Sequence, residues 1–294
     1  MQWADELGRY VRDPHGYWPP PNPLQANKLR ARCVERCEVG DDLEQLIKQI
    51  VNAAARRIAN AQPTLFLVNC GSSGSHWLEA MLSALPGMRA CGEVYVPAPI
   101  AETLKSLPEP QSACFLDGLH QLHSREPAPV GDDDILINSA HSWSCSDLAG
   151  TTARIALLIR DPLDVAVSRT FRKPQLRRHL MPDAHDESYL ERNIAFVERF
   201  YRSALRRKPA TIVRYEDIVA RPHEALAVLA NLVGRSATPA RCAQIAARYS
   251  ASGQQASGSR LSNVFRGPRV TIPPALEAHA AARLADLRAE MGYV

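Results

Sequence analysis

The chain has 294 residues, of which 46% are hydrophobic and 22% are charged, which suits the core of one large α/β domain or two small ones and argues against wholesale disorder. Its net charge of +4 is too small to indicate a nucleic-acid-binding face and fits a protein that binds an anionic small molecule. No apolar run reaches the about 18 residues of a membrane span, and the polar N-terminus does not resemble a signal peptide. We therefore expect a cytoplasmic protein whose seven cysteines are reduced and hold no metal.

The first 40 residues are rich in Trp, Tyr, Arg and Pro, and the run WPPPNP over 18–23 fits neither a helix nor a central strand. We expect an extended N-terminal arm or lid over 1–40, with a loosely ordered tail as the alternative. An α/β core is expected over 41–294. No repeat or clear linker interrupts the sequence, so a single domain over 1–294 is predicted.

Apolar runs and helical patterns alternate along this core. An amphipathic helix is expected over 41–60, and four apolar runs are typical of strands buried on both faces of a parallel sheet: 64–69, 134–139, 153–159 and 210–215. Helical patterns cover 75–85, 162–171, 188–207, 221–233 and 274–291. The alternation predicts a three-layer α/β/α fold whose central parallel sheet has about four to five strands.

The sharpest local pattern is TLFLVNCGSSGSHWLEAML over 64–82, where a strand passes through a Gly/Ser loop straight into a helix. Small residues let the backbone turn tightly, and the N–H groups at the start of a helix attract an anion, so this loop is predicted to bind phosphate. It lacks the Lys of a Walker A loop and the spacing of the dinucleotide-binding fingerprint. A tight connector without a ligand is the alternative.

Three further segments accompany the loop: ALLIRDPLDVAVSR over 156–169, IVRYEDIVARPHEALAVLANLVG over 212–234 and SNVFRGPRV over 262–270. In this order, they resemble the Arg–Ser pair, the R-Y-E-D-L segment and the F-R-K-G region of the PAPS-dependent sulfotransferases. Residues 72–77 resemble the P-K-S-G-T-T-W loop of the same family. This family has a P-loop-NTPase-like fold and uses 3′-phosphoadenosine 5′-phosphosulfate (PAPS). The resemblance implies transfer of a sulfuryl group from PAPS to a hydroxyl or amine acceptor, with PAP as the product.

The resemblance also implies which residues bind the donor. The loop would hold the 5′-phosphosulfate, while Arg160 and Ser168 would hold the 3′-phosphate that ATP lacks, since an Arg ending a strand and a Ser on the next helix can reach one phosphate. An ion pair with Asp161 or Asp164 is the alternative role for Arg160, and Trp77 either contacts adenine or packs in a helix core. The expected donor-binding residues are Gly71, Ser72, Ser73, Gly74, Ser75, His76, Trp77, Arg160, Ser168, Tyr215, Arg266 and Gly267.

Two residues are candidates for the catalytic general base. Glu93 in RACGEVYVP resembles the G-E-x segment of one branch of the family, and His141 in NSAHSW resembles the K-T-H segment of another. An imidazole suits the role near neutral pH unaided, whereas a carboxyl group needs its pKa raised by burial. The residues around Glu93 match slightly better, and both alternatives stay open.

The sequence departs from the family at Ser72, which occupies the place of a Lys or Arg that neutralises the leaving group. A serine hydroxyl donates a hydrogen bond but carries no charge. Another cation would have to replace the missing one, and His76, Arg172 and Lys173 are the candidates. The alternative functions are a non-catalytic protein that binds PAP or PAPS and, less strongly indicated, a P-loop kinase.

The acceptor is expected to be a small molecule, a glycan or a peptide. Its pocket is expected to be shaped by 1–40, 97–130 and 173–187. Basic residues there, including His120 and His123, would favour an anionic or polar acceptor or, in the simpler interpretation, belong to solvated surface. Association into a homodimer is left open.

Overall fold

A computed structural model describes residues 2–18, 24–37, 42–126, 128–172, 177, 181–250 and 272–293. The chain divides into two compact units. Unit 1 is Met1–Val68, Glu79–Ile155 and Val228–Ala237, and unit 2 is Asn69–Leu78, Ala156–Ala227 and Thr238–Val294. Each unit is described by itself, and the single domain expected over 1–294 stays a prediction.

The strands form one parallel sheet in the order β2-β3-β1-β4-β5. They are β1 (Thr64–Asn69), β2 (Met88–Gly92), β3 (Ile135–Ala140), β4 (Ala153–Ile159) and β5 (Thr211–Arg214). Every residue of β1 and β3 is buried, as expected of strands covered on both faces. The helix-flanked parallel sheet predicted from the sequence is confirmed, with β2 as the strand that the four apolar runs did not include.

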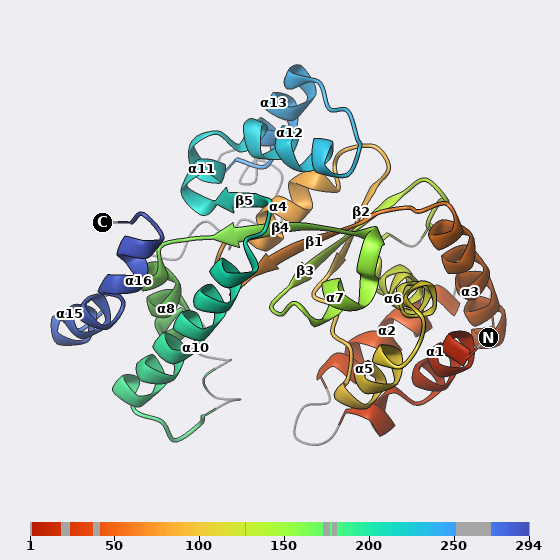
Figure 1. Ribbon diagram of the computed structural model, residues 1–294, viewed down its shortest axis with the longest axis horizontal. Coiled ribbons are helices and arrows are strands. Elements are labelled where there is room, and N and C mark those ends of the chain that lie inside the picture. The colour runs from red at the N-terminus through yellow and green to blue at the C-terminus, as the bar shows by residue number, and fades with distance from the viewer. Residues whose placement is uncertain are drawn as a thin grey trace. The chain divides into compact units, whose positions relative to one another are not determined.

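The helices of unit 1 surround one long buried helix. They are α1 (Gln2–Arg12), α2 (Leu24–Cys37), α3 (Leu43–Ala59), α5 (Ala98–Lys105), α6 (Glu109–His123) and α7 (Ser144–Ala149). The central helix α6 packs against α1, α2, α3 and α7 (Figure 1). Its Gly118 allows close packing, because a Cβ there would lie 2.7 Å from Leu7 Cδ2.

The extended arm expected over 1–40 is wrong for the residues described there, because they form the helices α1 and α2. Trp3, Leu7, Tyr10 and Val11 recur at helical spacing and are at most 4% exposed, so one face of α1 is buried. The prediction relied on the Trp, Tyr, Arg and Pro content of this segment and missed its amphipathic spacing. Most of the proline run, residues 19–23, lies outside the described residues.

Two histidines expected at an acceptor pocket or a solvated surface are buried instead. His120 and His123 are 1% and 8% exposed at the end of α6. Burial lowers the pKa of His120 to about 3 and that of His123 to about 4. Both rings are therefore neutral at physiological pH and add no positive charge to a binding site.

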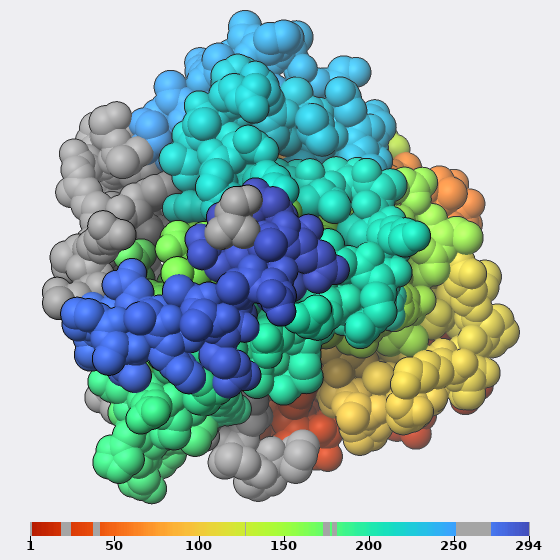
Figure 2. Space-filling view, turned by 60° about the vertical axis from the view of Figure 1, so that its left-hand side comes forward, coloured from red at the N-terminus to blue at the C-terminus, as the bar shows by residue number. Residues whose placement is uncertain are grey.

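The longest helix of unit 2 is α10. The helices of this unit are α8 (Pro162–Phe171), α10 (Asp186–Arg207), α11 (Tyr215–Ala220), α13 (Pro239–Arg248), α15 (Pro274–Arg283) and α16 (Ala285–Glu290). Helix α10 contacts α8 and α15, and the C-terminal helices are the dark blue segment in Figure 2. The helix expected over 274–291 is broken at Leu284 into α15 and α16.

Two helices continue from one unit into the other. They are α4 (Ser75–Leu82), which begins in unit 2, and α12 (Pro222–Leu232), which ends in unit 1. Among the described residues, no helix combines the length and apolar composition needed to cross a bilayer.

Candidate functional site

The Gly/Ser loop between β1 and α4 has three residues in the left-handed region of backbone conformation. Gly71, Ser72 and Gly74 have φ angles of 79°, 59° and 78°. Successive turns of this kind direct backbone N–H groups into a shared concave surface that suits an anion. Ser72 is strained because its Cβ disfavours this conformation, and such strain is concentrated at functional sites.

The Ser72 hydroxyl is an unsatisfied polar group of this loop. Its oxygen is buried, and no described residue forms a hydrogen bond with it. A buried hydroxyl without a partner is costly unless a ligand or water satisfies it. Ser72 therefore carries a hydroxyl donor that an anion would satisfy.

Tyr215, the first residue of α11, lies directly against this loop. A Cβ added to Gly74 would be 2.8 Å from Cδ2 of the tyrosine ring, which is closer than carbon atoms approach. The guanidinium carbon of Arg160 lies 4.3 Å from the centre of the same ring. Tyr215 therefore connects the loop with the end of β4, within unit 2.

We predict that Gly74→Ala weakens PAP binding by at least about 10-fold and destabilises the fold by about 2 kcal/mol, since the alanine must adopt a positive φ and displace the tyrosine ring. Gly234→Ala is the matched control, because Gly234 also has a positive φ of 72° and no atom lies within 4 Å of an added Cβ. Thermal unfolding and calorimetric titration with PAP measure both effects. Equal losses in the two variants would contradict the role of the tyrosine contact.

Arg160 and Ser168 line one cavity of about 400 Å³ in unit 2. The other lining residues are Leu163, Asp164, Val167, Arg172, Ile272 and Glu277. The structure therefore brings together the two groups expected to hold one phosphate. It also shows the alternative contact, because Nη2 of Arg160 donates a hydrogen bond to Asp164 over 2.9 Å.

The backbone and guanidinium group of Arg160 are both held in place. The buried Tyr201 hydroxyl accepts a hydrogen bond from the Arg160 N–H and donates one to its carbonyl, each at 3.2 Å. Nη1 donates to the carbonyl of Ser72 over 3.0 Å, while Nε is buried and has no partner among the described residues. One side chain thus contacts the loop and lines the cavity.

The remaining loop residues differ in their exposure. Ser73 in the loop and Ser75 at the start of α4 are buried, and His76 is exposed. Trp77 is 4% exposed, and its indole N–H donates to the carbonyl of Tyr249 over 2.9 Å. The structure shows the packing role for Trp77, and contact with adenine stays a prediction.

The two candidate bases in unit 1 are hydrogen-bonded to each other. Nε2 of His141, just after β3, lies 2.9 Å from Oε1 of Glu93, just after β2. The Tyr95 hydroxyl donates to Oε2 of Glu93 over 3.4 Å. Because β2 and β3 are parallel neighbours, the residues that follow them emerge at the same edge of the sheet. What the sequence offered as alternatives is one pair of groups.

A buried carboxyl group supports the residue before Glu93. Glu79 on α4 is 0% exposed, and its Oε1 accepts a hydrogen bond from the Gly92 N–H over 2.5 Å. Its Oε2 accepts from Arg125 over 3.1 Å. Burial outweighs these two contacts and raises the pKa of Glu79 to about 7.

This pKa predicts how stability depends on pH. A carboxyl group that titrates higher in the folded than in the unfolded chain stabilises the fold most below its ordinary value of 4.5, and that contribution is lost as the pH rises toward 7. Wild-type protein should lose about 2–3 kcal/mol of unfolding free energy between pH 5 and 8 relative to Glu79→Gln. Urea titrations at the two pH values measure this, with the exposed Glu102→Gln as the control. Parallel pH profiles for wild type and Glu79→Gln would contradict it.

Three of the expected residues lie outside the described residues, namely Lys173, Arg266 and Gly267. Two residues near the site were missed from the sequence: Glu79, and Arg169, whose only signal was its place directly after Ser168 in the Arg–Ser segment. Among the described residues, no group of three His, Cys, Asp or Glu side chains is arranged to hold a metal ion.

No protein-family model and no curated protein matches the chain. Solved structures do resemble it. Mouse sulfotransferase SULT7A1, complexed with PAP, is 17% identical with a TM-score of 0.51, over 77% of this chain and 85% of that one. A retinol dehydratase in complex with androsterone and the inactive cofactor PAP is 15% identical with a TM-score of 0.47, over 79% and 85% of the two chains. At such identities the likeness is one of fold.

Proposed function

We propose, from the sulfotransferase fold of this chain and the contacts of Arg160, that it moves a sulfuryl group from PAPS to a hydroxyl or amine acceptor. The observation that carries the proposal is that Arg160 contacts the Gly/Ser loop and shares a cavity with Ser168. A ligand with phosphate at both ends of an adenosine matches two adjoining anion sites. ATP has no 3′-phosphate and would leave the cavity empty.

The residues divide the donor between them. Backbone N–H groups of residues 72–76 and the Ser72 hydroxyl bind the 5′-phosphosulfate. The guanidinium of Arg160 and the hydroxyl of Ser168 bind the 3′-phosphate, with Arg172 adding positive charge to the same cavity. Tyr215 fixes the distance between the two sites through its contacts with Gly74 and Arg160.

Sulfuryl transfer needs little covalent help from the protein. The acceptor oxygen or nitrogen forms a bond to sulfur, the bond from sulfur to the bridging phosphate oxygen breaks, and PAP leaves with the electron pair. Positioning and electrostatic stabilisation therefore account for most of the catalysis, as in phosphoryl transfer.

The acceptor proton goes to the Glu93–His141 pair. If Nε2 of His141 carries the proton shared with Glu93, Nδ1 is the basic atom and the carboxylate stabilises the imidazolium that forms. If the carboxylate takes the acceptor proton, the imidazole orients it. Both routes use the same hydrogen bond, so the pair acts as a unit.

Incubation with sulfur-labelled PAPS and a panel of sugar, phenol, sterol and tyrosyl-peptide acceptors tests the proposal. We expect label in at least one acceptor and release of PAP. Ser72 in place of the family's cation favours a second function, a PAP- or PAPS-binding protein without catalysis. Donor binding with neither transfer nor slow hydrolysis would support that second function instead.

A further inference from the structure

The Gly/Ser loop contains no cation, yet it is held by two guanidinium groups. Arg160 precedes Asp161, the N-cap of α8, and donates to the carbonyl of Ser72 over 3.0 Å. Arg169 lies nine residues further along α8 and donates through Nη1 to the carbonyl of Cys70 over 2.8 Å. The loop is therefore held by two charged side chains, one from the residue before the N-cap of α8 and one from within α8.

Arg169 is fixed in position by contacts with α10. Its Nε donates to Oδ1 of Asn193 over 3.3 Å, and its guanidinium carbon lies 4.2 Å from the centre of the Phe196 ring. The amide of Asn193 is oriented in turn, because its nitrogen donates to the carbonyl of Tyr189 over 3.0 Å and to Thr170 Oγ1 over 3.1 Å. The contact with the loop thus costs little additional side-chain entropy.

These contacts fix the direction of the loop's peptide groups. The peptide group between Cys70 and Gly71 is held at both ends. Arg169 donates to the Cys70 carbonyl, and Asn69 Oδ1 accepts from the Gly71 N–H. The carbonyl of Gly71 accepts from the Ser73 hydroxyl over 3.3 Å. In a planar trans peptide the N–H points away from the C=O, so the N–H groups of Ser72 and Ser73 turn away from these donors. That orientation is the one an anion-binding loop requires.

We propose that Arg169 is a positioning residue for the 5′-phosphosulfate. From outside the loop, Arg169 orders the loop backbone and places a positive charge beside it, as a lysine in the loop would otherwise do. This inference rests on the proposed function. Adjacent residues of α8 then serve opposite ends of the donor, because neighbours on a helix point about 100° apart. Ser168 lines the cavity, and Arg169 holds the loop.

Of the cations first considered, Arg172 lines the cavity of Arg160 and Ser168 instead of holding the loop. His76 is exposed in the first turn of α4. Arg169 is distinguished from both by its direct contact with the loop backbone at Cys70.

Binding of two adenosine monophosphates distinguishes an effect of Arg169 on the loop from a general destabilisation of the fold. Adenosine 5′-phosphate occupies the loop alone, and adenosine 3′-phosphate occupies the cavity alone. Arg169→Ala should weaken adenosine 5′-phosphate and PAP by about 10- to 100-fold and change adenosine 3′-phosphate by less than about twofold. Arg169→Lys should restore part of the loss, since an ammonium can reach one carbonyl but lacks the guanidinium fork. Ser168→Ala should show the reverse selectivity.

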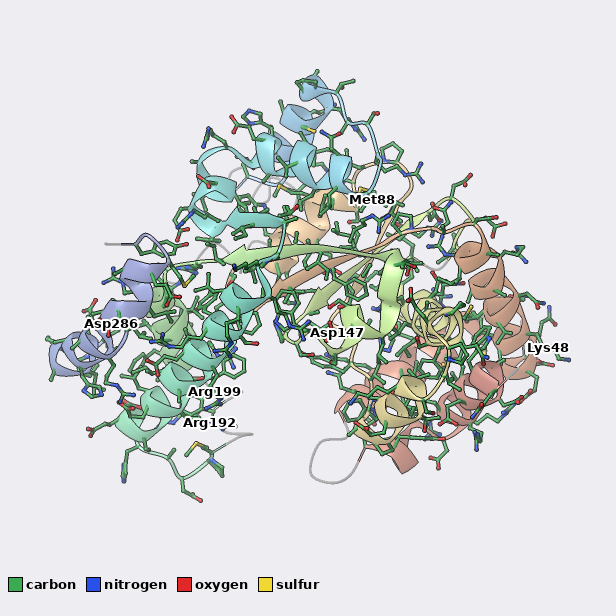
Figure 3. All side chains as sticks on the ribbon, in the orientation of Figure 1. Lys48, Met88, Asp147, Arg192, Arg199 and Asp286 are labelled. Atoms are coloured by element: carbon green, nitrogen blue, oxygen red, sulfur yellow. The ribbon has the colours of Figure 1, made fainter. Side chains whose placement is uncertain are left out.

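The control is Arg199→Ala, which removes an exposed arginine from α10, the helix that holds Arg169 (Figure 3). It should change neither affinity. Equal losses for the two monophosphates in both Arg169 variants, or no loss for either, would overturn the positioning role while wild type still bound PAP. A wild-type protein that bound none of the three nucleotides would overturn the proposed function and this inference together.

Discussion

Replacing Arg160 with alanine should raise the dissociation constant for PAP by at least about 100-fold, because the change removes charge-assisted hydrogen bonds to the 3′-phosphate and the support of the Ser72 carbonyl. Ser168→Ala removes one neutral donor from the same cavity and should cost about 10-fold. Isothermal titration calorimetry with PAP measures both values.

Two comparisons make this first result specific. Arg160→Lys keeps the charge but loses the fork that serves both the loop and the cavity, so it should recover only a small part of the affinity. Arg192→Ala removes an exposed arginine of α10 and should leave PAP affinity unchanged (Figure 3). Unchanged affinity in both Arg160→Ala and Ser168→Ala would refute the assignment of the 3′-phosphate.

The second large effect is on turnover rather than on binding. Glu93→Gln and His141→Ala should each lower kcat by about 10²- to 10⁴-fold and change PAP affinity by less than about twofold, since general-base catalysis is lost while the donor site is untouched. Because the two side chains share a hydrogen bond, the double variant should be scarcely slower than the worse single one. Rates of label transfer from PAPS under saturating donor measure all three.

The relative size of the two losses identifies the base. A larger loss in His141→Ala, with residual activity in Glu93→Gln, indicates the imidazole as the base and the carboxylate as its partner; the reverse order indicates the carboxylate. Tyr95→Phe is the control, because its hydroxyl contact with Glu93 is long at 3.4 Å and should matter little. Wild-type rates in both Glu93→Gln and His141→Ala would exclude the pair from catalysis.

The sequence predicted the interior strands well because each is a short apolar run, with β1 and β3 buried throughout and β4 buried over its last four residues. The bounds of β1 and β4 agree with the runs over 64–69 and 153–159 to the residue. Strand β2 was not among these runs because it is only five residues long and contains Arg89. Its composition does not distinguish it from a loop. Its place beside β3 is a tertiary fact with no local signature.

The residue types of the candidate site come from the sequence, whereas their arrangement comes from the structure. Arg160 and the loop follow strand ends, so a parallel sheet brings such residues to one edge, and Ser168 lies on the helix that follows Arg160. The bond between Glu93 and His141 joins residues 48 positions apart and depends on strand order. The contact of Arg169 with Cys70 spans 99 positions. The contact of Arg169 depends on how α8 packs against α10, which local sequence patterns do not encode.

The most direct test of this account is a pair of calorimetric titrations of wild-type protein, one with PAP and one with ATP, under identical salt conditions. Two adjoining anion sites joined through Arg160 predict that PAP binds at least about 100-fold more tightly than ATP, because only PAP fills both. Equal affinities, or a preference for ATP, would mean that the cavity of Arg160 and Ser168 does not hold a 3′-phosphate, and the sulfuryl-donor assignment would be wrong.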